Sequence, residues 1–293
     1  MTKNDELRID DAPSMRPGLI AYRVVAYTFM VFICFLCLFF FYMLIINTTR
    51  THAEIQKGFS MLPGHNFLNN WKNLMANQEL PVFRGIFNSL VVSAGSAVLA
   101  TYFSALTAYA IHAYDFKLKN FAFKFILLIM TVPTQVTTLG FLDLIRDFKM
   151  MDTYWPLILP SIAAPTVFFF MKQYMDSVLP LEIVEAARID GSGEFYTFNT
   201  IILPIMKPAI AVQAIFTFVS SWNNYFVPAL VITKKDLKTL PILIAQLRSA
   251  DWLKFDMGQV YMMIALSILP IIIVYLFLSK FIIAGVAFGG GKE

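Results

Sequence analysis

The chain alternates between long stretches without any charged side chain and shorter polar segments. Windows of about 18 or more residues that lack Asp, Glu, Lys and Arg are candidate membrane spans, because a charge inside hydrocarbon is costly. Such windows lie between Arg23 and Arg50, Arg84 and Asp115, Lys124 and Asp143, Asp152 and Lys172, Lys207 and Lys234, and Asp256 and Lys280. The pattern therefore predicts six transmembrane segments.

The predicted spans are helices, because an open sheet edge cannot satisfy its backbone in lipid and a barrel would alternate in polarity. Prolines 133, 156, 160 and 165 predict kinks in the third and fourth spans. We expect an all-α membrane protein with one domain. Its expected parts are an N-terminal segment 1–23, a first transmembrane helix 24–46, a polar loop 47–84, a core 85–285 and a tail 286–293.

Composition agrees with a membrane protein: 58% of the residues are hydrophobic, only 14% are charged and the mean hydropathy is +0.66. A soluble domain carries about a quarter charged residues. The net charge of +4 comes without a long Lys/Arg run, which excludes a nucleic-acid partner. Cys34 and Cys37 lie inside the first apolar window, where we interpret them as apolar filler.

The chain offers no chemistry of its own for catalysis or ion coupling. The three histidines are scattered without carboxylate or cysteine neighbours at ligand spacing, so no metal site is expected. Proton- or sodium-coupled carriers place ionisable groups inside the bundle, and the six windows hold none apart from His112 at one end. The glycines near Lys292 lack the hydroxyl residue and the following helix of a nucleotide loop, so ATP must bind another chain.

Small and hydroxyl residues form one stripe along the second span. They are Ser89, Ser93, Ser96, Ala100, Ser104 and Thr107. Steps of three and four place them on one helical face, and such faces let helices approach closely. We favour tight packing over solute contact for this stripe.

A polar stripe in the fifth span suits a sugar, which needs directional hydrogen bonds and a flat aromatic surface. It comprises Gln213, Thr217, Ser220 and Asn224, beside Trp222, Asn223 and Tyr225. The third span adds Thr131, Gln135 and Thr138 on one stripe. The candidate solute-pathway residues are Gln135, Gln213, Ser220, Asn223, Asn224 and Tyr225. Hydrogen bonding between helices is an equally good interpretation for any one of them.

The connection 173–206 between the fourth and fifth spans is mixed in polarity and has helix signals. Pro180 suits a helix start and Gly191 its end, Ser192 can cap a second helix, and Pro204 interrupts that helix. Two short helices at an angle are predicted. Such a rigid elbow could receive a push from a soluble partner, or its first helix could rest on the membrane surface.

The spacing in this connection resembles that of a known family. Glu185-Ala186-Ala187, then Gly191, then Ile201, then Leu203-Pro204 matches the loop signature of permease subunits of bacterial ATP-binding-cassette importers at every fixed position. The likeness extends over about Arg84 to Gly285. Further pairs resemble the carbohydrate branch, in particular the smaller maltose-transporter-like permease: Asn88-Ser89, Asp190-Gly191, Lys207-Pro208 and Trp222-Asn223. Ser192-Gly193 departs from the Ala-Ser that is more common in that branch.

This resemblance implies a type I importer transmembrane domain of six helices with a two-helix cytosolic coupling loop. The residues implied to contact the ATPase are Glu185, Ala186, Ala187, Asp190, Gly191, Ile201, Leu203 and Pro204. The implied location is the bacterial cytoplasmic membrane, with both termini and the loop in the cytosol and 47–84 outside, an orientation that Lys/Arg counts leave open. The glycine-rich tail resembles one that reaches toward the ATPases.

The implied partners are a second homologous permease, two ATPase subunits that hold ATP and Mg²⁺, and an extracytoplasmic solute-binding protein. The implied solute is a sugar or short oligosaccharide. Three alternatives stay open: a permease for a polyol phosphate or another small polar solute, an ATP-independent channel or carrier, and a scaffold whose loop recruits a partner without transport.

Overall fold

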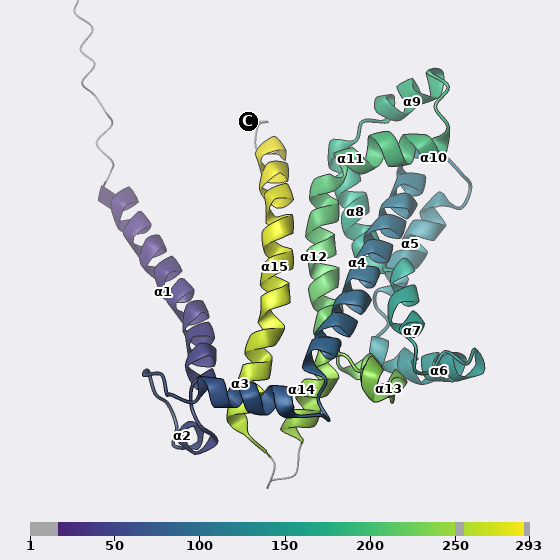
Figure 1. Ribbon diagram of the computed structural model, residues 1–293. Helices are drawn as coiled ribbons and strands as arrows, with labels where there is room; N and C mark the ends of the chain where they lie inside the picture. The colour runs from purple at the N-terminus through teal and green to yellow at the C-terminus, as the bar shows by residue number, and fades with distance from the viewer. Residues whose placement is uncertain (1–16, 250–254, 290–293) are drawn as a thin grey trace, which may run out of the picture.

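The computed structural model describes residues 17–249 and 255–289, and this part of the chain is helical without a β-strand (Figure 1). The long helices are α1 (Pro17–Thr48), α4 (Val82–Ala113), α12 (Lys207–Trp222) and α15 (Met257–Gly289). Medium-length helices are α3 (Phe67–Ala76), α5 (Lys119–Ile129), α6 (Thr134–Asp147), α8 (Pro165–Val178), α9 (Leu181–Ile189) and α14 (Leu240–Arg248). Short ones are α2 (His52–Gln56), α7 (Trp155–Ile158), η1 (Leu159–Ile162), α10 (Glu194–Thr197), η2 (Phe198–Ile202), α11 (Leu203–Ile205), α13 (Phe226–Val231) and η3 (Lys235–Leu237).

Four helical segments in the described part of the chain are long and apolar enough to cross a membrane. They are Ala21–Thr48, Val82–Ala113, Trp155–Val178 and Met257–Phe281. A fifth is reached if α10–α11 and α12, which meet at a bend of 81°, are counted together. The predicted count of six spans is therefore not confirmed, although the all-α membrane architecture is.

The third predicted span is divided. α5 ends at Ile129 and α6 begins at Thr134, with Pro133 in an extended conformation as the cap of α6. Proline disfavours a helical conformation in the residue before it, which explains why the break falls at Val132 and Pro133. α6 then lies across the end of the bundle (Figure 1). Thr131 therefore lies in the break, away from the stripe that was predicted to continue to Gln135.

The fifth predicted window is also interrupted. α12 ends at Trp222, and Asn223, Asn224 and Tyr225 connect it to α13. The 16 residues of α12 are about 24 Å long, short of a hydrocarbon core of about 30 Å. The polar residues at the end of this window thus lie in a turn.

The packing predicted for the second span is confirmed for five of its six residues. Ser89, Ser93, Ser96, Ala100 and Ser104 are all buried in α4, which packs between α8 and α12. Gly85 lets α14 approach, because a Cβ at this position would lie 2.5 Å from Leu243 Cδ1. Thr107 is exposed instead, and it lines a cavity together with residues of α5 and the beginning of α8.

The two ends of the bundle carry different elements. The beginning of α1, the end of α15 and the elbow α9–α11 lie at one end, which we call the α9 end (Figure 1). Helices α2, α3, α6, α13 and α14 lie at the other, the α14 end. α1 meets α15 near the α14 end and stands away from the other helices, and only 6% of its most apolar window is buried.

Candidate coupling loop and solute cavities

The first helix of the elbow begins where the sequence predicts. α8 ends at Val178, and Pro180 caps α9 in an extended conformation. Glu182 lies in the first turn of α9 and Arg188 in the last, the arrangement that the helix dipole favours. The sequence of the elbow therefore determines α9 locally.

Gly191 ends α9 in a left-handed conformation, with φ of +76°. Its N–H donates to the carbonyl of Arg188 at 3.0 Å, and the N–H of Ser192 donates to the carbonyl of Ala187 at 2.9 Å. These two bonds form a Schellman motif, which satisfies the last carbonyls of a helix. Only glycine adopts this conformation without a steric cost, so the predicted helix end is confirmed.

Two details of the second helix differ from the prediction. Gly193, not Ser192, is the N-cap of α10, because Ser192 is held in the Schellman turn and its hydroxyl lies 2.7 Å from Thr197 Oγ1. Pro204 does not break the chain of helical residues, since α10, η2 and α11 run without a gap from Glu194 to Ile205, and the turn before Leu203 and Pro204 is a π-helix. The chain bends by 81° after Ile205, between α11 and α12.

The residues of the loop signature divide into two groups. Glu185, Ala186, Asp190, Gly191 and Pro204 are exposed. The others pack inward: Ala187 is buried, and Ile201 and Leu203 are half-buried against the core around Phe198. The signature thus combines an outward surface with the contacts that anchor it.

Large apolar side chains add to this outward surface, and the sequence reasoning missed them. Ile189 is 86% exposed, Phe195 68% and Tyr196 63%, on an elbow that stands off the bundle (Figure 1). Exposed apolar groups on a polar loop are typical of a surface that binds another protein. In the sequence these residues lie between polar neighbours on the two helices predicted for the elbow, and this pattern could have indicated their exposure.

A polar network joins the elbow to α4. Arg188 Nε donates to Glu194 Oε1 at 2.7 Å, and the Tyr109 hydroxyl donates to Glu194 Oε2 at 3.0 Å. The Arg188 guanidinium lies 5.2 Å from the ring centre of Tyr114. The Glu194 carboxylate therefore bridges two helices that are far apart in the sequence, which no local pattern reveals.

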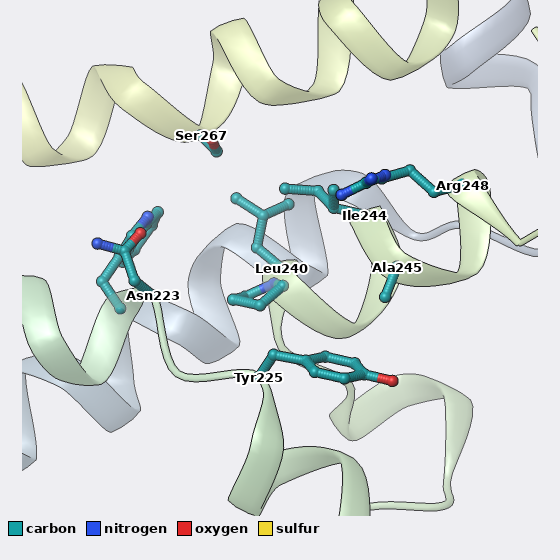
Figure 2. A pocket seen from close by; sticks show the side chains of 9 residues that line it. Asn223, Tyr225, Leu240, Ile244, Ala245, Arg248 and Ser267 are labelled. Carbon is teal, nitrogen blue, oxygen red and sulfur yellow. The ribbon is translucent and has the colours of Figure 1, made fainter. Parts of the chain in front are cut away.

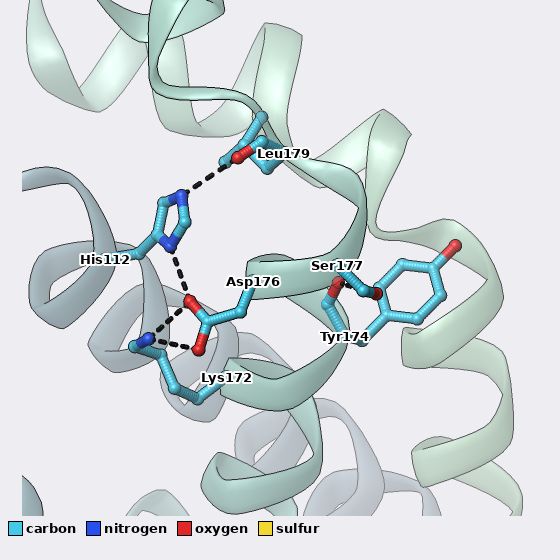
Figure 3. A network of polar contacts seen from close by, with 6 residues as sticks. All are labelled: His112, Lys172, Tyr174, Asp176, Ser177 and Leu179. Atoms are coloured by element: carbon cyan, nitrogen blue, oxygen red, sulfur yellow. Dashed lines mark hydrogen bonds and ion pairs between the residues drawn. The ribbon is translucent and has the colours of Figure 1, made fainter.

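A second network holds the other side of the elbow (Figure 3). His112 Nδ1 lies 2.8 Å from Asp176 Oδ1 and His112 Nε2 lies 3.0 Å from the carbonyl of Leu179. Lys172 Nζ donates to Asp176 Oδ2 at 2.6 Å. Both ring nitrogens face acceptors, so both contacts are hydrogen bonds only when the ring carries two protons. His112 thus ties the end of α4 to the residue that precedes the elbow.

Three of the six candidate solute residues line one cavity of about 420 Å³, which we call the neutral cavity. They are Gln213 and Ser220 of α12 and Asn224 of the turn after it, and Ser96, Ser161 and Thr166 also line the cavity. None of the residues that line it is charged. Gln213 is only 7% exposed, and its amide has no hydrogen-bond partner among the described residues.

The other three candidates lie elsewhere. Asn223 and Tyr225 line a second cavity of about 380 Å³ together with Arg248 and Ser267, the Arg248 cavity (Figure 2). Gln135 is exposed on α6 and lines neither cavity. Asn223 and Asn224 are adjacent, but both follow the end of α12 at Trp222, and in this turn they line different cavities. Periodicity could not separate them because it assumes a continuous helix.

The described residues contain no group of three His, Cys, Asp or Glu side chains that could hold a metal ion. Residues 290–293 of the glycine-rich tail and 1–16 of the N-terminal segment lie outside the described part of the chain.

A helical bundle with an outward elbow at one end and polar cavities between its helices is the architecture of a membrane permease. Residues 97–287 match the family of binding-protein-dependent transport system inner membrane components. The chain belongs to this family, the permease subunits of ATP-binding-cassette importers.

Relatives cover nearly the whole chain. The arabinooligosaccharides transport system permease protein AraQ of Bacillus subtilis is 33% identical over 94% of this chain and 98% of its own. The sn-glycerol-3-phosphate transport system permease protein UgpE of Escherichia coli O1:K1 is 28% identical over 92% of this chain and 96% of its own.

A solved structure shares the fold. It is the crystal structure of a bacterial ABC transporter involved in the import of the acidic polysaccharide alginate, with a TM-score of 0.78 at 18% identity. The match covers 92% of this chain and 99% of that one. The expected type I importer fold is thereby confirmed.

Proposed function

We propose that this permease carries a neutral sugar or short oligosaccharide, and that its neutral cavity forms part of the solute pathway. The observation that carries the proposal is the lining of that cavity, which offers hydroxyl and amide groups and no charge. A neutral sugar needs such donors and acceptors, whereas an anion needs a cation beside it. The arabinooligosaccharides permease among the relatives supports the same solute class.

In the proposed orientation the α9 end faces the cytosol, with the beginning of α1 and the end of α15 on the same side. The exposed apolar residues of the elbow support this orientation, because a docking surface for an ATPase must lie where ATP is. The segment between α1 and α4 then lies outside the cell.

The proposed assembly contains a second permease, two ATPase subunits and an extracytoplasmic binding protein. ATP and Mg²⁺ are held by the ATPases, and this chain supplies only the surface around Glu185, Ile189 and Gly191 that they push. The neutral cavity, which this chain lines from one side, would be completed by the companion permease.

Transport then follows a mechanical cycle. Closure of the ATPases on ATP moves α9, and the bend between α11 and α12 passes the motion to the helix that carries Gln213. The cavity turns outward to accept solute from the binding protein, and ATP hydrolysis returns it inward. The ATPases can drive this change only if they bind the elbow more tightly in one state of the cavity, inward or outward, than in the other.

The test is uptake by the complete assembly in proteoliposomes supplied with ATP inside. Gln213→Leu is expected to lower the apparent affinity for an arabino-oligosaccharide by about three- to tenfold, the loss of one hydrogen bond. Gln135→Leu serves as the matched control and should leave uptake unchanged, since it lies outside both cavities. Equal uptake by the two variants would remove the neutral cavity from the pathway.

The coupling role of the loop is tested separately with Glu185→Lys. This substitution reverses a charge on the outward face and should uncouple ATP hydrolysis from uptake without impairing membrane insertion. Solute flux through this chain alone, without nucleotide or ATPase, would instead support an ATP-independent channel. ATPase binding without flux in the full assembly would support a scaffold.

A polyol phosphate is the second candidate solute, because the glycerol-3-phosphate permease is also a relative. Among the described lining residues of the two α12 cavities, the cation available to a phosphate is Arg248. Arg248→Gln should spare uptake of a neutral sugar and abolish uptake of glycerol 3-phosphate. The two solutes are thus distinguished by one variant.

A further inference from the structure

The elbow is joined in different ways to α12 and α4, two of the helices that line the neutral cavity. α12 follows α11 directly along the chain, so any movement of the elbow reaches Gln213 through the backbone. α4, which contributes Ser96 to the same cavity, has no such connection and must be moved through side-chain contacts. The strength and direction of those contacts decide whether both walls of the cavity move together.

Most contacts between α4 and the elbow are apolar and can slide. The ring of Tyr109 packs against Phe198 at 5.6 Å between centres, and Tyr102 packs against the same ring at 5.7 Å. Directional contacts are fewer: Tyr109 donates to Glu194 at 3.0 Å, and Tyr102 donates to Asn199 Oδ1 at 3.2 Å. Only the first of these continues to α9, through Arg188.

Glu194 lies in the middle of the hydrogen-bonded route from Arg188 of α9 to Tyr109 of α4. One carboxylate oxygen accepts from Arg188 of α9 and the other accepts from Tyr109, which is only 2% exposed in α4. The Arg188–Glu194 pair connects α9 to α10, and the Arg188 guanidinium also lies over the ring of Tyr114 at the end of α4. The carboxylate therefore links the outward helix to a fixed point in the core.

We propose that Glu194 is a positioning residue that transmits the displacement of α9 to α4 through Tyr109, so that both walls of the neutral cavity move together. The inference rests on the proposed function. Tyr109 lies about 20 Å from Ser96 along α4, at about 1.5 Å per residue, so a stiff helix carries the motion from the elbow to the cavity. His112 ties α4 to Leu179 on the other side of α9, which makes the elbow a segment held to α4 before and after its outward helix.

The roles of the groups follow from their charges. The Glu194 carboxylate draws the Arg188 guanidinium toward α4, and hydrogen bonds to an ionised carboxylate are stronger and more directional than neutral ones. The pair is partly exposed, with 38% of the Arg188 side chain and 41% of the Glu194 side chain accessible. Its contribution to fold stability is small for that reason, so its removal should leave the protein folded.

The experiment measures solute imported and ATP hydrolysed in the same proteoliposomes, with the complete assembly and its binding protein. Glu194→Gln and Tyr109→Phe are the test variants, and Glu182→Gln, an exposed carboxylate on α9 itself, is the matched control. Each test variant should lower the solute imported per ATP by at least about fivefold, the lower end of coupling between sites. The double variant should lose no more than the larger single loss, because both substitutions break one route. Glu182→Gln should match the wild type.

Two results would overturn the proposal. One is an unchanged ratio of imported solute to hydrolysed ATP in both test variants. The other is a lowered ratio that is accompanied by an equal fall in the amount of ATPase that copurifies. The second result would make Glu194 a docking residue. Tyr109→Phe removes one hydroxyl and keeps the ring, so it tests the route even if Glu194→Gln assembles poorly. If the wild-type assembly imports no sugar, the proposed function fails. If the wild-type assembly imports sugar and either of the two results above is found, the present inference fails while the proposed function stands.

Discussion

The two ends of the bundle are held by different kinds of contact, mainly side chain to backbone at the α14 end and side chain to side chain around the elbow. At the α14 end, loops are bonded to helices within the chain: Asn88 donates to the carbonyls of Asp236 and Lys238, both at 2.9 Å, and Asp152 accepts from the backbone of Thr233 and Lys234. At the α9 end, the elbow holds to the core through a few contacts and turns Ile189 outward. The elbow also leaves Ile189, Phe195 and Tyr196 exposed, which fits the proposed docking of an ATPase at that end.

The largest change should come from Asn70 at the α14 end. Its side chain is fully buried and donates to the carbonyls of Thr48 and Arg50 at 2.8 and 2.9 Å. Asn70→Ala leaves both carbonyls without this donor, at a cost of about 3 kcal/mol in the free energy of unfolding. Thermal unfolding in detergent measures it. Asn69→Ala, at an exposed neighbour, should change little, and equal melting of the two variants would contradict the contrast between the ends.

The next effect is on binding. Ile189→Asp places a charge on the outward apolar surface and should weaken association with the ATPase by about 30-fold, or about 2 kcal/mol, while thermal unfolding stays unchanged. Leu62→Asp is the control, since Leu62 is 76% exposed at the α14 end. If Leu62→Asp weakened association with the ATPase as much as Ile189→Asp, the contrast between the two ends would be contradicted.

A smaller effect is expected at the turn of the elbow. A Cβ at Gly191 meets no atom within 4 Å, so the cost of Gly191→Ala comes from the positive φ alone and should be about 1 to 2 kcal/mol. Gly193→Ala is matched to it, with equally open space and an ordinary φ of −69°. Thermal unfolding should separate the two variants, and the ratio of solute to ATP should fall only for Gly191→Ala. Indistinguishable variants would mean that the left-handed turn does not hold the elbow.

The smallest effect depends on pH. Hydrogen bonds from the backbone of Lys234 and from Thr233 lower the pKa of Asp152 below its ordinary value of 3.8. A carboxyl with a lowered pKa in the folded state stabilises the fold above its unfolded pKa and loses that contribution as the pH falls through the folded value. Asp152 is partly exposed to solvent, so the effect should stay below about 1 kcal/mol. Melting temperatures between neutral pH and pH 3 should decline less for Asp152→Asn than for the wild type, and parallel curves would assign the decline to other carboxyls.

Local chemistry explains which expectations were confirmed. Pro180 and Gly191 set the ends of α9 through backbone conformations that those residues prefer wherever they occur. The small residues from Ser89 to Ser104 were predicted to pack because their period matches that of a continuous helix, and α4 is continuous. Where the helix is broken, as at Val132 and Pro133 or after Trp222, the helical period no longer applies, and Gln135 and Asn223 do not line the neutral cavity with Gln213.

The sequence by itself determined the membrane class, the all-α architecture and the elbow, because hydrocarbon excludes charge and because proline and glycine act on their own residues. Only the tertiary structure decided that Gln213 and Asn224 share a cavity with Ser96, that Asn223 belongs to another with Arg248, and that Glu194 lies between Arg188 and Tyr109. These contacts join residues far apart in the chain, so they depend on how helices cross. Helix crossing is set by the packing of whole surfaces, which no local pattern contains.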